Sequence, residues 1–225
     1  MIPLSLVQRI TSEYEAHRNP EKAVKMAAYM KNLFPFLGIQ TPEREALSKP
    51  IWAEITPFVT EPWLVEVALL LWEKDQREYQ YAALSLLSKQ VKLLSPVAMP
   101  AIEHLITHKS WWDTVDTIAS RLVGSLVFRF PELLPTLEQY STHDNLWLRR
   151  TAILHQLSYK QNTDAERLWR YCTLNADSKE FFIQKAIGWA LREYSKTNRN
   201  AVVEYIQRNE HRLSNLSKRE GLKRI

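Results

Sequence analysis

The sequence predicts an all-α protein made of stacked helix pairs, and three observations support that fold class. Hydrophobic residues recur at helical spacing through nearly all of the 225 residues. Only four glycines are present, which is too few for the many sharp turns of a β-rich chain of this length. Segments that open helices also recur about every 35 residues, a period typical of helical repeats.

The repeat is clearest at Tyr81, Asp116, Arg150 and Lys185, which follow one another at 35, 34 and 35 residues. This period is shorter than a typical HEAT unit and close to the tetratricopeptide length, but the tetratricopeptide signature residues are absent. We therefore expect a HEAT-like solenoid, a single domain over residues 1–225. Its stacked helices should form a curved superhelix with a basic concave groove.

Several helix starts are marked by a capping side chain beside a proline or an acidic first turn. These starts are Asn19-Pro20-Glu21, Thr41-Pro42-Glu43, Thr60-Glu61-Pro62, Ser95-Pro96 and Asp177-Ser178-Lys179-Glu180. Linkers are short throughout, so the helices follow one another closely. In chain order we expect them over residues 4–16, 20–34, 42–54, 61–74, 77–93, 98–108, 112–129, 131–140, 145–159, 164–175, 179–196, 200–209 and 216–224.

Charge is distributed unevenly along a chain whose formal net charge is +5. Residues 1–110 carry 12 Lys/Arg and 12 Asp/Glu, whereas residues 111–225 carry 18 and 13. The basic second half favours a polyanion partner, although many helical proteins have basic faces without binding DNA. Cys172 is the only cysteine, and no apolar stretch approaches the roughly 18 residues of a membrane span. We therefore expect no disulfide, signal peptide or membrane span.

Two tryptophans and two carboxylates lie together in the segment from Ser110 to Asp116. Trp112 and Asp116 are four residues apart, so a helix places them on the same face. Indole faces and carboxylates both attract cations, and the pair therefore suits a cationic ligand or transition state. Taken alone, the segment also permits a core tryptophan beside a solvated carboxylate.

The repeat register predicts which residues lie beside this segment. Equivalent positions of stacked repeats lie side by side, so Asp116, Arg150 and Lys185 are expected in a row. Trp189 and Arg192 follow Lys185 at helical spacing and share its face. One carboxylate is then expected between two indoles in a basic groove.

Cations interleaved with aromatic rings suit phosphates and the stacking of bases or sugars. A carboxylate among them repels phosphate, so its presence needs another reason. It can stabilise the positive charge that develops on a sugar when a glycosidic bond breaks. Electrostatic stabilisation of this kind is commonly the largest catalytic contribution, on the order of 3–4 kcal/mol for one well-placed group.

Over essentially its whole length the chain resembles the AlkD-like DNA alkylation-repair glycosylases, a HEAT-like-repeat family. The segments that carry the resemblance are Tyr29–Asn32, Phe36–Arg44, Lys109–Asp116, Asn145–Arg150 and Ser178–Trp189. The resemblance implies a hydrolase of base excision repair, a DNA-3-methyladenine/7-methylguanine glycosylase. Such an enzyme removes positively charged N3- and N7-alkylpurines from double-stranded DNA and leaves an abasic site.

The resemblance also implies roles for individual residues. The catalytic carboxylate falls on Asp116, the two active-site tryptophans on Trp112 and Trp189, and the phosphate-contacting arginine on Arg150. The further candidates for DNA contacts, which lie in matching segments, are Lys185, Arg192, Gln40 and Tyr29.

Glycosylases generally flip the damaged base into a pocket. The family resemblance implies instead that the base stays stacked. A cationic alkylpurine is already a good leaving group, so the enzyme need only stabilise the sugar cation and position water. We expect a cytoplasmic monomer, nucleoid-associated when it acts on DNA, with no cofactor. No metal site is expected either, because His104 and His108 are four residues apart but no third ligand converges on them.

Two smaller features and two alternatives remain open at this point. Trp147 precedes Arg150 by three residues and either supports it or simply packs. Gly188 costs a helix about 1 kcal/mol relative to alanine and can permit the close approach of another helix. The alternatives to a glycosylase are a DNA-binding relative without catalysis and a protein-binding solenoid scaffold, which would lack salt-dependent DNA affinity.

Overall fold

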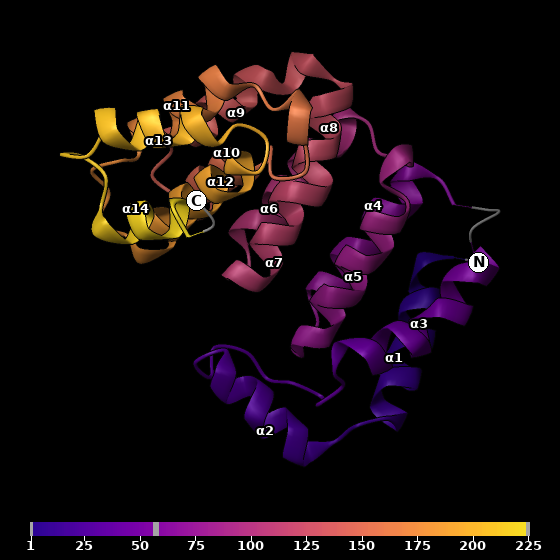
Figure 1. Ribbon diagram of the computed structural model, residues 1–225. Coiled ribbons are helices and arrows are strands. Elements are labelled where there is room, and N and C mark those ends of the chain that lie inside the picture. The colour runs from indigo at the N-terminus through magenta and orange to yellow at the C-terminus, as the bar shows by residue number, and fades with distance from the viewer. Residues whose placement is uncertain (1, 56–58, 224–225) are drawn as a thin grey trace. The chain divides into compact units, whose positions relative to one another are not determined.

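The computed structural model describes residues 2–55 and 59–223 (Figure 1). The described residues form helices and no β-strand, which confirms the all-α fold class. The chain divides into two compact units, Met1–Ala101 and Ile102–Ile225. A single domain over the whole chain stays a prediction. In the part of the chain that is described, no helix is long and apolar enough to cross a membrane.

The first unit is built mainly by five helices. α1 packs against α3 and α4, and α5 packs against α3 and α4. Apolar side chains at helical spacing, such as Leu64, Val67 and Leu71 of α4, are fully enclosed and form its core. The five helices are α1 (Pro3–Ala16), α2 (Pro20–Tyr29), α3 (Thr41–Ile55), α4 (Glu61–Trp72) and α5 (Arg77–Lys89).

The predicted helix over 20–34 is shorter in the structure, where α2 ends at Tyr29. Lys31 and Asn32 both have positive φ, 58° and 57°, and this left-handed backbone ends the helix. Its start agrees with the prediction, because the side chain of Asn19 accepts a hydrogen bond from the Lys22 N–H at 3.0 Å. The chain then turns away from the helix axis and leads towards α3.

The short 3₁₀ turns Val91–Leu93 and Pro96–Ala98 lead into α6 (Met99–Thr107), which crosses the boundary between the units. The second unit continues with a helical run over residues 112–129, the range that the periodicity predicts. The run comprises α7 (Trp112–Thr117), a π-helical turn (Ile118–Val123) and α8 (Gly124–Arg129). No sequence pattern indicated the π-helical turn. Such turns inside α-helices often occur at functional sites.

The remaining helices of the second unit pack around α10 and α12. α10 contacts α7, α9, α11 and α12, and α12 also contacts α13 and α14 (Figure 1). The chain brings them in this order, with short 3₁₀ turns at Pro131–Leu133 and Lys160–Asn162. The helices are α9 (Leu134–Ser141), α10 (Leu146–Leu154), α11 (Ala165–Leu174), α12 (Phe181–Ser195), α13 (Arg199–Arg208) and α14 (Asn215–Gly221).

Several predicted boundaries differ from the structure, and the helix predicted over 77–93 ends at Lys89. The helix predicted over 145–159 ends at Leu154, and the one predicted from 179 starts at Phe181. The carboxylate of Asp177 does not cap that helix but accepts hydrogen bonds from Arg212, at 2.6 Å from Nη2. The last predicted helix ends at Gly221, and the final predicted position, 224, lies outside the described residues.

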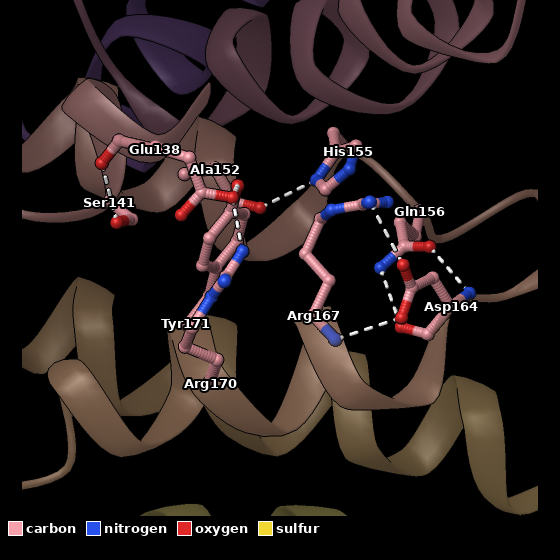
Figure 2. Close-up of polar contacts among 9 residues, drawn as sticks. All are labelled: Glu138, Ser141, Ala152, His155, Gln156, Asp164, Arg167, Arg170 and Tyr171. Carbon is pink, nitrogen blue, oxygen red and sulfur yellow. Dashed lines mark hydrogen bonds and ion pairs between the residues drawn. The ribbon is translucent and has the colours of Figure 1, made fainter. Parts of the chain in front are cut away.

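Polar contacts link α9 to α11, and the end of α10 to the start of α11, as Figure 2 shows. His155 is fully enclosed, and its Nδ1 lies 2.7 Å from the Ala152 carbonyl. Its Nε2 has no hydrogen-bond partner among the described residues. Burial lowers the pKa of His155 to about 4, with the nearby Arg167 cation acting in the same direction and Asp164 opposing it. His155 is therefore neutral in the folded protein at physiological pH.

This buried histidine predicts a loss of stability in mild acid. Below about pH 6.5 the unfolded chain binds a proton at His155, whereas the folded protein does so only near pH 4. The free energy of unfolding should therefore fall as the pH drops through this window, by roughly 3 kcal/mol in full. Urea denaturation at pH 7 and pH 5 measures the effect. In His155→Leu the pH dependence should be smaller, and equal dependence in both proteins would contradict the prediction.

Candidate functional site

Asp116 and Arg150 form a two-point ion pair between α7 and α10. Arg150 donates from Nε to Oδ1 at 2.6 Å and from Nη2 to Oδ2 at 2.8 Å. The two residues are 34 positions apart, so this contact confirms the register that the repeat predicted for them. The side chain of Arg150 is only 1% exposed, whereas that of Asp116 is 20% exposed. The carboxylate is thus held by a buried arginine and remains partly exposed.

The third guanidinium nitrogen of Arg150 is also occupied, because Nη1 donates to the Phe182 carbonyl at the start of α12. This buried arginine therefore fixes the orientation of the Asp116 carboxylate, and it has no nitrogen without a hydrogen bond. Its part as a phosphate contact stays a prediction. Burial raises the pKa of Asp116, while the hydrogen bonds and charge of Arg150 act against that shift.

Three cations surround the indole of Trp189 on α12. Its ring centre lies 5.2 Å from Cζ of Arg150, 5.4 Å from Nζ of Lys185 and 6.0 Å from Cζ of Arg192. Lys185, Trp189 and Arg192 thus share one helix face, as their spacing predicts. Trp189 reaches Asp116 through Arg150, so the carboxylate, the buried arginine and the indole form one continuous cluster.

A second carboxylate, that of Glu220 on α14, lies beside this cluster. Its Oε1 is 3.1 Å from Nζ of Lys185, and its Oε2 accepts a hydrogen bond from Nη1 of Arg192 at 2.9 Å. The hydrogen bond with Lys185 lowers the pKa of Glu220 below its ordinary value, although partial burial opposes this. Sequence analysis did not single out Glu220, although it lies 35 residues after Lys185 and so continues the register of Asp116, Arg150 and Lys185.

Trp112 is the first residue of α7 and lies one turn before Asp116, half-buried. Its neighbour Trp111 packs edge-on against Phe182 at 4.8 Å between ring centres. Trp147 packs against both of these rings, at 5.7 Å from Trp111 and 5.1 Å from Phe182. Trp147 therefore packs within an aromatic cluster, next to Phe182, whose carbonyl accepts a hydrogen bond from Arg150. Of the two roles that its spacing left open, supporting Arg150 or packing, the structure shows packing.

Gln40 and Tyr29 lie in the first unit, and both are exposed. Gln40 follows a loop held from beneath by the fully buried carboxylate of Glu78. Glu78 accepts hydrogen bonds from the N–H groups of Leu37, Gly38 and Ile39, at 3.0, 2.9 and 3.1 Å. The backbone of this loop is therefore rigidly held just before the exposed Gln40 side chain.

The Asp116 cluster offers a defined electrostatic environment. A partly desolvated carboxylate and an indole stabilise a positive centre, and the surrounding cations attract an anion. Among the described residues, no group of three or more His, Cys, Asp or Glu is placed to hold a metal ion.

Solved structures of other proteins share the fold of this chain. A structure described as a predicted DNA alkylation repair enzyme from Enterococcus faecalis is 40% identical, with a TM-score of 0.85 over 92% of this chain and 96% of that one. The structure of smu.31 from Streptococcus mutans UA159 shares the fold at 15% identity, with a TM-score of 0.61 over 81% of this chain and 95% of that one. A search of curated proteins found no match. The profile of the family described as DNA alkylation repair enzyme matches residues 10–225, and the chain therefore belongs to the DNA alkylation repair enzyme family.

Proposed function

We propose that this DNA alkylation repair enzyme is a glycosylase that hydrolyses the N-glycosidic bond of positively charged N3- and N7-alkylpurines in duplex DNA. The observation that carries the proposal is the Asp116 carboxylate, held at two points by the buried Arg150 and still partly exposed. A carboxylate oxygen has lone pairs beyond those that accept from arginine, so the carboxylate remains able to face a cationic sugar.

The proposed reaction needs little chemistry from the protein. The bond between C1′ of the deoxyribose and the purine nitrogen breaks, and its electron pair goes to the base, which leaves as a neutral alkylpurine. The sugar is left with oxocarbenium character, and the Asp116 carboxylate stabilises this charge. Water adds to C1′ and loses a proton, which gives the abasic site. Because the base leaves without protonation, the reaction requires no general acid, metal or organic cofactor.

In this proposal the two tryptophans face the deoxyribose, and the basic side chains hold the backbone. Trp112 lies one helical turn from Asp116, and Trp189 lies beside the arginine that holds it. Lys185 and Arg192, with Gln40 and Tyr29 from the first unit, are the proposed DNA contacts. Arg150 would join them by exchanging one of its three hydrogen bonds for a phosphate. The enzyme acts as a monomer, and the damaged base stays stacked while the sugar is attacked.

Selectivity should then follow the charge and lability of the lesion. Duplex DNA containing uracil is expected to be a very poor substrate, because the neutral base leaves with the negative charge that Asp116 cannot stabilise. Release of uracil and of 7-methylguanine from matched duplexes, measured by chromatography, checks this prediction. Rapid release of uracil would contradict the proposal that selectivity follows the charge of the lesion.

The proposed function itself is tested by incubating the protein with duplex DNA treated with a methylating agent. Released 3-methyladenine and 7-methylguanine are quantified by chromatography against a protein-free control, since both lesions also depurinate spontaneously. Release well above the control supports the proposal. A folded protein that binds the duplex but releases neither base would favour a DNA-binding member of the family without catalysis.

A further inference from the structure

The carboxylate of Glu220 neutralises part of the cation cluster on α12. Each of its oxygens contacts a different cation, Lys185 at 3.1 Å and Arg192 at 2.9 Å. Only 9% of the Glu220 side chain is exposed, but 21% of Lys185 and 25% of Arg192 remain exposed. The cations thus still reach solvent on one side while the carboxylate holds them on the other.

This contact depends on an unusually close approach of α14 to α12. A Cβ atom on Gly188 would lie 2.5 Å from Cβ of Glu220 and 3.0 Å from the Ser217 carbonyl, so glycine is required there. The Ser217 hydroxyl also donates to the Gln184 carbonyl at 2.9 Å. The approach confirms the role that the sequence allowed for Gly188. It places Glu220 against the same helix face that presents Trp189.

The charges of this cluster have opposite effects on DNA, because the two cations attract phosphate and the Glu220 carboxylate repels it. Lys185 and Arg192 carry two positive charges, and Glu220, which Lys223 also influences, places one negative charge between them. A phosphate that approaches the exposed sides of these cations is attracted by them and repelled by Glu220. Each cation that neutralises a phosphate contributes about 0.9 to the salt dependence of log K, so Glu220 reduces the number of full contacts available.

We propose that Glu220 is a positioning residue that competes with DNA phosphate for Lys185 and Arg192 and thereby limits the affinity of the protein for undamaged duplex. The inference rests on the proposed function, in which these two cations contact the DNA backbone. A glycosylase must leave abasic product and the large excess of undamaged DNA, and a built-in counter-charge shortens both encounters. Glu220 is ionised throughout the physiological range, so this effect is permanent and not switched by pH.

The test measures binding of an undamaged fluorescent duplex over a range of salt concentrations. Glu220→Gln preserves the shape of the side chain and removes its charge, so the salt slope of log K should steepen by about 0.9. The affinity should rise about 5- to 10-fold at 0.1 M salt, because one added phosphate contact contributes about that factor between 1 M and 0.1 M salt. If the contacts of Glu220 only hold α14 in place, Glu220→Gln should bind DNA more weakly with an unchanged salt slope.

Asp177→Asn is the matched control, because it changes the net charge by the same amount at an exposed pair with Arg212. Its salt slope should equal that of the wild type, which separates a local effect from one of overall charge. Glu220→Asp retracts the carboxylate by one methylene and keeps its charge, so its slope should lie between those of the wild type and Glu220→Gln. Circular dichroism and thermal melting show whether each variant is folded. If Glu220→Gln loosens α14, Glu220→Asp, which keeps the charge, still tests the inference.

An unchanged slope in folded Glu220→Gln, or an equal change in Asp177→Asn, overturns the inference. The proposed function fails separately, because binding to undamaged duplex does not depend on base release. A wild-type protein that shows no salt-dependent binding to DNA would contradict the glycosylase proposal itself. Normal wild-type binding with no effect of Glu220→Gln would contradict only the role of Glu220.

Discussion

Replacing Asp116 by Asn is expected to slow the release of 7-methylguanine by about 100- to 1,000-fold while leaving the affinity for duplex DNA nearly unchanged. The amide keeps the shape of the carboxylate but removes the charge that would face the sugar cation, and a single preorganised group contributes on this scale. Single-turnover release from a duplex with one lesion, at saturating protein, measures the chemical step without the contribution of binding.

The variant also changes stability, and this effect must be separated from catalysis. Arg150 is buried and would lose its counter-charge, which costs on the order of 3 kcal/mol when a buried pair is broken. The double variant Asp116→Asn with Arg150→Gln removes both charges and should recover much of that stability without recovering excision. If the double variant excised the base at the wild-type rate, Asp116 would have no catalytic part, whatever its effect on folding.

The Asp116–Arg150 contact is predictable from sequence because a stacked repeat converts spacing along the chain into contact between helices. The same logic placed Lys185, Trp189 and Arg192 on one face, since their spacing is set within a single helix. What spacing did not supply is the depth of each side chain. Arg150 has the residue type of a phosphate ligand, but its position beneath Asp116 depends on the Phe182 carbonyl, which a sequence pattern does not reveal.

The same register extends to Glu220, which lies 35 residues after Lys185, so its contact with Lys185 could have been predicted from the spacing. The spacing did not show that α14 packs closely enough on α12 for the carboxylate to reach Arg192 as well. Gly188 gave a partial signal, since a glycine inside a helix often marks a close approach, but it did not indicate which helix approaches. The end of α2 was missed because only Asn32 suggested left-handed backbone, whereas Lys31 adopts it as well.

The second large effect is expected in the first unit, at Glu78. In Glu78→Gln the amide oxygen can accept only part of what the carboxylate accepts from Leu37, Gly38 and Ile39, and its NH₂ group would face a backbone N–H. Hydrogen bonds to a charged group contribute roughly 1.5–3 kcal/mol each, and leaving a buried donor unpaired adds to the loss. We expect the free energy of unfolding to fall by about 3 kcal/mol, measured by urea denaturation.

The same substitution should weaken DNA binding through Gln40, which follows this loop directly. Affinity for duplex is expected to fall several-fold with an unchanged salt slope, because Gln40 is neutral and neutralises no phosphate. Gln40→Ala provides the reference, and its loss should not add to that of Glu78→Gln, since both remove the same contact. Glu45→Gln is the control, because that carboxylate contacts Lys89 on the surface, at 3.5 Å, and holds no backbone loop. Additive losses would show that Glu78 supports the first unit without positioning Gln40, and the loop would then be a structural element alone.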